Sequence, residues 1–469
     1  MNEKHRSALL HGLAICLVLA TGWAWFCTMA NQTDARILSG KVDAYSIAVV
    51  EQIIYSYATT GTWAQTIHTT YTDAWTWSEH RPLWIFPSAW LYGLSPGPLV
   101  LGHIQLGIVA LGGLFAFGLG HRVLGGVAGG LAAALMWYGS PSLAVVSINV
   151  FQELVFGMPW LMLAAWGLRG GRPILFLVGA FACLAAREEW LPAVALLGLG
   201  QPGGFMTRVK ATASSVAVAV VYLGLLSAID GPLPSNNPML VLGHAIAGKL
   251  DWHRTPAQIH DFYVPFLAPY ALGVLAPLTA LPGVAALVFQ VLTPKYQTGV
   301  DAGWTEHIHH LAPVIGFFTL ATVDALGWMR RLVNARKPAW AKFTSWAVLG
   351  IAICGTGATS VNWQRIEGLY PAIRLTHAKP APEWALVDDN VPPDASIATD
   401  THGSLYIARR LHAYTYDDSF EDKLKGNRLA QVDWILLNKN DTAFKAQLLD
   451  QPGIVEVART PHYLLYRLR

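Results

Sequence analysis

Side chains able to move protons or to bind phosphate lie beside the long apolar runs of this sequence. Asp43 begins the segment DAYSIAVVEQIIYSYATTGTW, whose apolar residues recur at helical spacing. A carboxylate at the start of such an amphipathic helix can act as a general base. Asp is equally a favoured helix N-cap, so both roles stay open for Asp43.

A histidine and an arginine stand together where the next apolar segment begins, in SEHRPLWIFPSAWLYGLSP. His80 and Arg81 can hold a phosphate or pyrophosphate through charge-assisted hydrogen bonds. The alternative is that Arg81 only extends to a membrane interface. We therefore take the pair as a candidate substrate-binding site.

Further ionisable residues interrupt apolar sequence. Glu153 follows Asn149 by four residues in SINVFQELVFGMPW, which places both on one helical face. Arg187 and Glu188 stand within AREEW, inside a hydrophobic stretch. Charge within or beside a membrane span is costly and usually functional, although an Arg–Glu pair can also be structural.

The segment GWTEHIHHLAP is a possible divalent metal site, with Glu306, His307 and His310 as its ligands. His307 and His310 are three residues apart and can share a helical face, and imidazole and carboxylate are common metal ligands. Binding of a phosphate or a sugar, or a solvated loop end, accounts for the same residues.

Composition separates a membrane part from a water-soluble part. The 469 residues are 53% hydrophobic and only 13% charged, against about 25% charged in soluble domains. Of the 32 basic and 29 acidic residues, 13 and 14 lie in 362–469. We predict a membrane domain over 1–361, with a large first outer loop at about 31–81, and a soluble domain over 362–469. No basic run with interleaved aromatics indicates nucleic-acid binding.

The apolar runs predict about eleven spans, several of them short for a full crossing, and the first span is uncleaved with its N-terminus inside. The runs lie at 10–29, 97–118, 124–143, 150–168, 173–186, 190–200, 211–229, 262–278, 280–293, 309–328 and 342–360. With that orientation the inner loops are basic, Arg169 included, except for a tight turn near Pro282. The tail then lies outside, where its mixed helical and extended segments predict a small α/β domain.

These pieces, in this order, resemble the DUF2079 family of bacterial polytopic membrane proteins. The resemblance rests on Asp43 to Gln52, His80-Arg81-Pro82-Leu83 through Pro96, Phe151-Gln152-Glu153, Arg187-Glu188-Glu189, and His309-His310-Leu311-Ala312-Pro313. At Gln152 the family pattern has His, so any role of that position is in doubt.

That family in turn is similar to integral-membrane glycosyltransferases of the GT-C fold, which implies a mainly helical bundle with a small extracytoplasmic α/β domain. The resemblance implies a polyprenyl-phosphate sugar donor, with membrane lipid as a partner, and a multi-pass protein of the bacterial cytoplasmic membrane and cell envelope. Asp43 would deprotonate the acceptor, with inversion at the anomeric carbon. Arg81, Arg187 or the histidines would stabilise the departing lipid phosphate.

Two other classes of function remain open. A transporter or flippase of a lipid-linked or small polar substrate would account for many spans, but not for the long first outer loop or the tail. A non-catalytic subunit of a membrane complex would account for the 19 Trp and 16 Tyr, which interfacial belts explain as well. The residues do not specify the sugar, the acceptor, the metal or the oligomeric state.

Overall fold

A computed structural model describes the chain over residues 3–40, 42, 44–63, 66–67, 82–148, 151–230, 267–292, 308–364, 379–416, 432–442, 445, 448 and 453–468. Two compact units divide it. The bundle unit comprises Met1–Ala30, Glu79–Trp84 and Gln105–Leu375. The sheet unit comprises Asn31–Ser78, Ile85–Ile104 and Thr376–Arg469.

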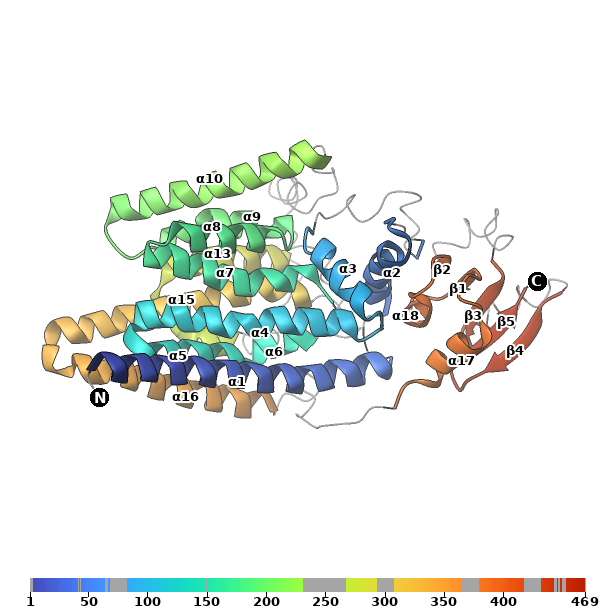
Figure 1. Ribbon diagram of the computed structural model, residues 1–469, viewed down its shortest axis with the longest axis horizontal. Helices are drawn as coiled ribbons and strands as arrows, with labels where there is room; N and C mark the ends of the chain where they lie inside the picture. Colours follow the sequence, from blue (N-terminus) through green and yellow to red (C-terminus); the bar gives the residue numbers. More distant parts are fainter. Residues whose placement is uncertain are drawn as a thin grey trace. The chain divides into compact units, whose positions relative to one another are not determined.

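The bundle unit is built from helices that run alongside one another (Figure 1). Two helices, α1 (Glu3–Leu38) and α4 (Val100–Gly120), begin in one unit and end in the other. The remaining elements are η2 (His121–Gly125), α5 (Gly126–Tyr138), α6 (Pro141–Ile148), α7 (Glu153–Gly170), α8 (Pro173–Leu184), η3 (Glu188–Trp190), α9 (Leu191–Leu196), η4 (Leu197–Gly200), α10 (Phe205–Asp230), η5 (Ala268–Leu275), α13 (Pro277–Leu292), η7 (Ile308–Leu311), α15 (Ala312–Arg336), η8 (Pro338–Trp340) and α16 (Ala341–Gln364).

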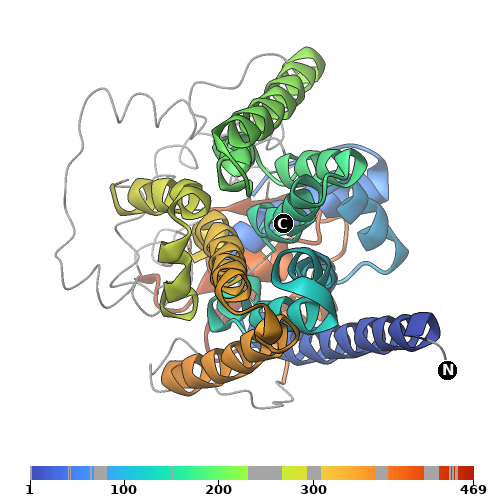
Figure 2. The same cartoon turned by 90° about the vertical axis from the view of Figure 1, so that its left-hand side faces the viewer.

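Several of these helices are long and apolar enough to cross a membrane. Long stretches of this kind are His5–Leu38, Val100–Tyr138, Phe205–Ala228 and Ala312–Arg336, and shorter apolar helices occupy Pro173–Leu184, Pro277–Val288 and Phe343–Gly355. In α15, 89% of the apolar window is buried, so this helix forms the centre of the unit. Figure 2 shows α13 (yellow-green) beside α15 (light orange), against which it packs. The predicted mainly helical membrane fold is confirmed.

The stretch Val100–Tyr138 is a helical hairpin rather than one straight helix. Gly125 and Gly126 have φ of 85° and 65°, a left-handed backbone that glycine adopts without steric cost. The chain therefore turns back, and the Trp137 Nε1 of α5 donates a hydrogen bond of 3.1 Å to the Val109 carbonyl of α4. Two of the predicted runs, 97–118 and 124–143, are the two arms of this hairpin.

Two expectations about loops need correction. The turn expected near Pro282 lies at Ala276, between η5 and α13, and Pro282 stands inside α13. Pro277, at the first position of α13, marks the helix start, because its fixed φ suits that position and no donor is lost there. Arg169, expected in an inner loop, lies in the last turn of α7 and is buried.

The sheet unit holds a five-stranded sheet in the order β2-β1-β3-β5-β4. Strand β1 pairs in parallel with β2 and β3, whereas β5 pairs antiparallel with β3 and β4. Ile435, Leu437, Leu464 and Tyr466 belong to its core. The elements are α2 (Ala44–Thr60), α3 (Ile85–Leu94), α17 (Pro382–Asn390), β1 (Ile397–Thr399), α18 (Ser404–Ile407), β2 (Ala413–Thr415), β3 (Trp434–Asn438), β4 (Val455–Arg459) and β5 (Tyr463–Arg467).

Within the sheet unit, the segment after α2 is bonded to the edge strand β2. The Gln52 side chain accepts the main-chain N–H groups of Thr66 at 2.8 Å and Ile67 at 3.0 Å. The Thr66 hydroxyl donates to the Ala413 carbonyl, and the Thr415 hydroxyl donates to the Ile67 carbonyl at 2.7 Å. Helix α2, the described residues after it and the edge strand β2 thus pack together within the sheet unit.

Candidate functional site

The site residues expected from the sequence fall into two groups. Glu153, Arg187, Glu188 and His310 are described and all lie in the bundle unit. The others lie outside the described residues: Asp43, His80, Arg81, Glu306 and His307. For these the roles derived from the sequence stay predictions.

Glu153 is the first residue of α7 and is only 8% exposed. The turn before it is fixed by Gln105 of α4, whose Nε2 donates to the Ser147 carbonyl at 2.8 Å and whose Oε1 accepts from the Gln152 N–H at 2.7 Å. A carboxylate in the first helical turn is favoured by the helix dipole. Gln152 therefore acts here through its backbone, as the residue that leads into α7.

Arg187, Glu188 and Glu189 form an irregular connection between α8 and α9. Arg187 is extended, with φ −164° and ψ 152°, and the 3-10 turn η3 follows. Trp190 fixes this turn against α7, because its Nε1 donates to the Leu154 carbonyl at 2.9 Å. A Cβ at Gly157 would lie 2.1 Å from that Nε1. Any larger residue at this position would therefore clash with the indole that packs on α7.

Glu189 stands between two basic groups. Its Oε1 lies 3.0 Å from Nη2 of Arg187, and its Oε2 lies 3.7 Å from Nδ1 of His310. The side chains of Arg187 and His310 are only 5% and 8% exposed. We call Arg187, Glu189 and His310 the Arg–Glu–His cluster. Glu188, the residue singled out from the sequence, lies beside it and is 1% exposed.

The segment after Arg81 lies against the same connection. The Trp84 main-chain N–H donates to the Ala185 carbonyl at 3.2 Å, and its indole Nε1 donates to the Ala182 carbonyl at 2.8 Å. The Trp84 ring stacks on Trp160 at 5.4 Å between ring centroids. Trp84, which follows the His80-Arg81-Pro82 motif by two residues, is therefore bonded to Ala185, which precedes Arg187 by two residues.

The Arg–Glu–His cluster is suited to an anionic group. A guanidinium and an imidazole can both donate to phosphate oxygens, and burial strengthens each of these charge-assisted bonds. A buried guanidinium paired with a carboxylate is found both at functional sites and in structural ion pairs, so binding of an anion by this cluster is a proposal. Within the described ranges, no group of three or more His, Cys, Asp or Glu is arranged to hold a metal ion.

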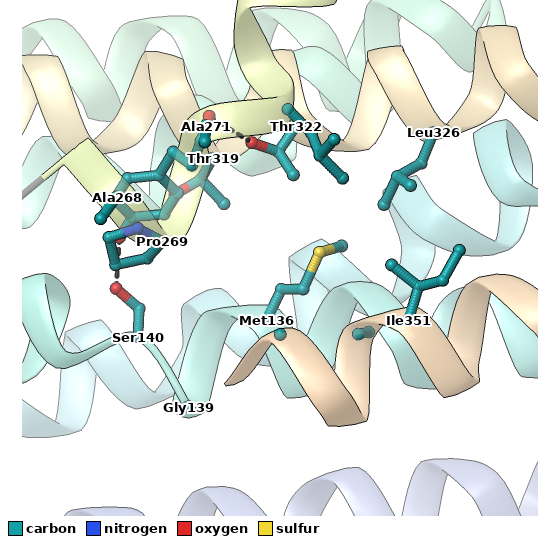
Figure 3. Close-up of a pocket in the computed structure, with 14 residues that line it drawn as sticks. Met136, Gly139, Ser140, Ala268, Pro269, Ala271, Thr319, Thr322, Leu326 and Ile351 are labelled. Atoms are coloured by element: carbon teal, nitrogen blue, oxygen red, sulfur yellow. Dashed lines mark hydrogen bonds between the residues drawn. The ribbon is translucent and has the colours of Figure 1, made fainter. Parts of the chain in front are cut away.

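A cavity of about 170 Å³ lies elsewhere in the bundle unit (Figure 3), bounded by α5, η5, α15 and α16. Met136, Leu326 and Ile351 supply much of its apolar wall, and the hydroxyls of Ser140 and Tyr270 are hydrogen-bonded to each other. Of the described residues that line it, none is acidic, basic or a histidine. Its wall is mostly apolar, with the hydroxyls of Ser140, Tyr270, Thr319 and Thr322 as the polar part, so it can accept a small hydrocarbon group.

The sheet unit buries a carboxyl group within the same segment that Asp43 begins, at a residue that the sequence does not single out. Glu51 of α2 is 0% exposed, and its Oε1 accepts a hydrogen bond of 3.0 Å from the hydroxyl of Tyr92 in α3. Its Oε2 has no hydrogen-bond partner among the described residues. Burial raises the pKa of Glu51 from 4.5 to about 7, although the Arg409 charge and the Tyr92 hydrogen bond act to lower it.

The comparisons with known proteins agree with the predicted fold. The model of a family described as "Predicted membrane protein (DUF2079)" matches residues 41–234 and 237–465. Among solved structures, the chain is similar to ArnT from Cupriavidus metallidurans bound to undecaprenyl phosphate. The TM-score is 0.55 at 14% identity, and the likeness covers 99% of this chain and 98% of that one. No curated protein matches the sequence.

A second solved protein is less similar. The oligosaccharyltransferase of Archaeoglobus fulgidus, in a complex with Zn and sulfate, has a TM-score of 0.41 at 11% identity, over 90% of this chain and 68% of that one. The ArnT likeness shows the fold alone, and it confirms the predicted GT-C-like bundle with a small α/β region.

Proposed function

The chain belongs to the DUF2079 family of predicted membrane proteins, and we propose that it is an integral-membrane glycosyltransferase of the GT-C type. Its donor is a sugar carried on a polyprenyl phosphate, and its acceptor lies outside the cytoplasm. The ArnT structure that shares its fold is bound to undecaprenyl phosphate, which supports a lipid phosphate as the partner. The basic inner loops support a bacterial cytoplasmic membrane location with the tail outside.

The Arg–Glu–His cluster is the observation that carries this proposal. Arg187 and His310 donate to the lipid phosphate, and Glu189 lies within 3.0 Å and 3.7 Å of them and orients both. As the bond between phosphate and sugar breaks, negative charge grows on the phosphate. Preorganised donors stabilise that charge more in a buried site than in water. His80 and Arg81 extend the phosphate site, and Glu153 and Glu188 contact the sugar hydroxyls.

Asp43 is the base in this scheme. The acceptor oxygen attacks the anomeric carbon, the bond from that carbon to the phosphate oxygen breaks, and the polyprenyl phosphate leaves with the electron pair. The acceptor proton passes to the Asp43 carboxylate. A positioned base contributes about 10²–10⁴-fold in rate. The cavity in Figure 3 is suited to a short length of the prenyl chain, because most of its wall is apolar.

The test separates binding from turnover in the purified full-length chain in liposomes. Binding of undecaprenyl phosphate is measured for the wild type, Arg187→Gln and Asp43→Asn, alongside transfer of labelled sugar from polyprenyl-phosphate donors. Arg187→Gln should weaken binding by about 10- to 100-fold, because a charge-assisted bond is worth roughly 1.5–3 kcal/mol. Asp43→Asn should bind normally and lose transfer by orders of magnitude.

Arg336→Gln is the matched control, since Arg336 is an exposed arginine in the last turn of α15. It should change neither binding nor transfer. Retained transfer by Asp43→Asn would remove Asp43 as the base. Absence of transfer by the wild type with every lipid-linked donor, together with substrate flux across the liposomes, would establish a carrier instead.

A further inference from the structure

A second buried charged cluster lies in the bundle unit, and the proposed chemistry does not use it. Arg169 of α7 and Asp324 of α15 are 6% and 7% exposed. The Arg169 Nε donates to Asp324 Oδ1 at 3.0 Å, and Nη2 donates to Oδ2 at 2.6 Å. The Thr279 hydroxyl of α13 donates to the same Oδ2 at 2.9 Å. The pair is thus bidentate and has a third partner.

A fourth segment closes on this pair. The Gly200 carbonyl, at the end of η4, accepts a hydrogen bond of 3.5 Å from Nη2 of Arg169. A Cβ at Gly200 would lie 2.3 Å from the Thr279 Oγ1 and 2.8 Å from that Nη2. Only glycine therefore leaves room for the junction, at which α7, η4, α13 and α15 all meet.

The three segments that carry the candidate site all lead to this junction. Along α7, Glu153 precedes Arg169 by 16 residues, and Glu189 precedes Gly200 by 11 residues through α9 and η4. His310 precedes Asp324 by 14 residues through η7 and α15. At a rise of 1.5 Å per residue the junction lies about 20–25 Å along α7 and α15 from the site.

We propose that Arg169 and Asp324 are positioning residues, which set the axial register of these three segments and so bring Glu153 and the Arg–Glu–His cluster together at their other end. This inference rests on the proposed function for the role of the site, but not for the register. Helices in a membrane associate mainly by van der Waals packing. A bidentate arginine–carboxylate pair adds a directional contact, because it forms in one geometry.

One substitution separates register from simple stability. Replacing a buried ion pair by apolar residues of similar volume is often neutral or stabilising, whereas removing one partner is strongly destabilising. The variant Arg169→Met/Asp324→Leu should therefore keep the thermal midpoint while losing the directional contact. Asp324→Asn alone should lower the midpoint, because it leaves the arginine charge uncompensated.

The readout is hydrogen exchange of the full-length chain in detergent, measured by mass spectrometry over 187–190 and 308–311. With register lost, amides there should exchange about tenfold faster or more in Arg169→Met/Asp324→Leu, although they lie about 20 Å from the change. The control is the same pair of replacements at an exposed ion pair, Arg459→Met/Glu456→Leu, which should leave these amides unchanged. Binding of undecaprenyl phosphate is measured in parallel.

If Arg169→Met/Asp324→Leu folds and its amides at 187–190 and 308–311 exchange at the wild-type rate, the inference is overturned and the pair is a structural contact only. If the apolar variant does not fold, Thr279→Val makes the same comparison, because it removes one hydrogen bond and leaves both charges paired. A different result separates the two proposals. If the variant exchanges faster but the wild type does not bind undecaprenyl phosphate, the register role is supported and the proposed function is refuted.

Discussion

Because Glu51 is buried, we expect its contribution to the stability of the sheet unit to fall as the pH rises. The carboxyl group is wholly buried, and its pKa is about 7 in the folded chain against 4.5 when unperturbed. Between these values the folded state holds a proton that the unfolded state has released. The contribution of Glu51 to stability is therefore most favourable below pH 4.5 and falls until about pH 7, above which its penalty is constant.

The pKa difference sets the size of the effect. One pKa unit corresponds to about 1.36 kcal/mol, so the shift from 4.5 to about 7 gives a penalty of about 3 kcal/mol above pH 7. Glu51→Gln keeps the shape and an oxygen that accepts the Tyr92 hydrogen bond, and it removes the titration. The variant should gain about 3 kcal/mol on the wild type between pH 4.5 and pH 8.

Hydrogen exchange of peptides from α2 measures this difference, because wild type and variant are compared at the same pH and the intrinsic exchange rate cancels. The measured quantity is the ratio of the wild-type to the Glu51→Gln exchange rate for the α2 amides. This ratio should be about 100-fold larger at pH 8 than at pH 4.5. Glu456→Gln is the control, since that carboxyl lies on the exposed strand β4 of the same unit. A ratio that stays flat from pH 4.5 to 8, or one that changes in the opposite direction, would refute the reasoning.

Two further outcomes are expected from particular contacts, and a third from the charge of the predicted inner loops. Gly157→Ala should lower stability by about 1–3 kcal/mol, seen as a lower thermal midpoint, because the new Cβ meets the Trp190 indole at 2.1 Å; an unchanged midpoint would contradict that packing. Trp84→Phe should cost about 1 kcal/mol by removing its indole hydrogen bond, and hydrogen exchange at 182–187 should rise; equal exchange would show that the bond does not hold this segment. A reporter fused after Arg336 should lie inside and one after Arg469 outside, and an inside tail would reverse the orientation on which the donor argument depends.

The sequence predicts the regular elements well where one physical signal dominates. Apolar runs give the membrane helices, and the spacing around Ile47 and Ile54 predicts α2. In the tail, the mixed helical and extended segments predict a small α/β domain, and the five-stranded sheet supplies its extended part. Strand β2 has no signal of its own in the sequence, because three residues are too few for a periodic pattern and its place depends on pairing with β1.

The candidate site was predicted by residue type but not by contact. Glu188 was chosen over Glu189, yet Glu189 is the one that pairs with Arg187 and His310. Side-chain direction in the irregular turn η3 follows its backbone angles, which helical periodicity does not encode. The Arg169–Asp324 pair joins residues 155 positions apart, and a single sequence carries no signal for such a contact.

The hydrogen bonds between the segment after α2 and strand β2 set an order for the folding of the chain during its synthesis. Ile67 and Thr415 are hydrogen-bonded to each other although 348 positions separate them. At a synthesis rate of 5–20 residues per second, the ribosome needs roughly 17–70 s to traverse that interval. The buried face of α2 must wait for that time with its partner strand still unmade, while the intervening helices insert. Packing of the segment after α2 therefore has to follow synthesis of β2, and until then the carbonyl of Ile67 lacks the partner that it has in the folded sheet unit.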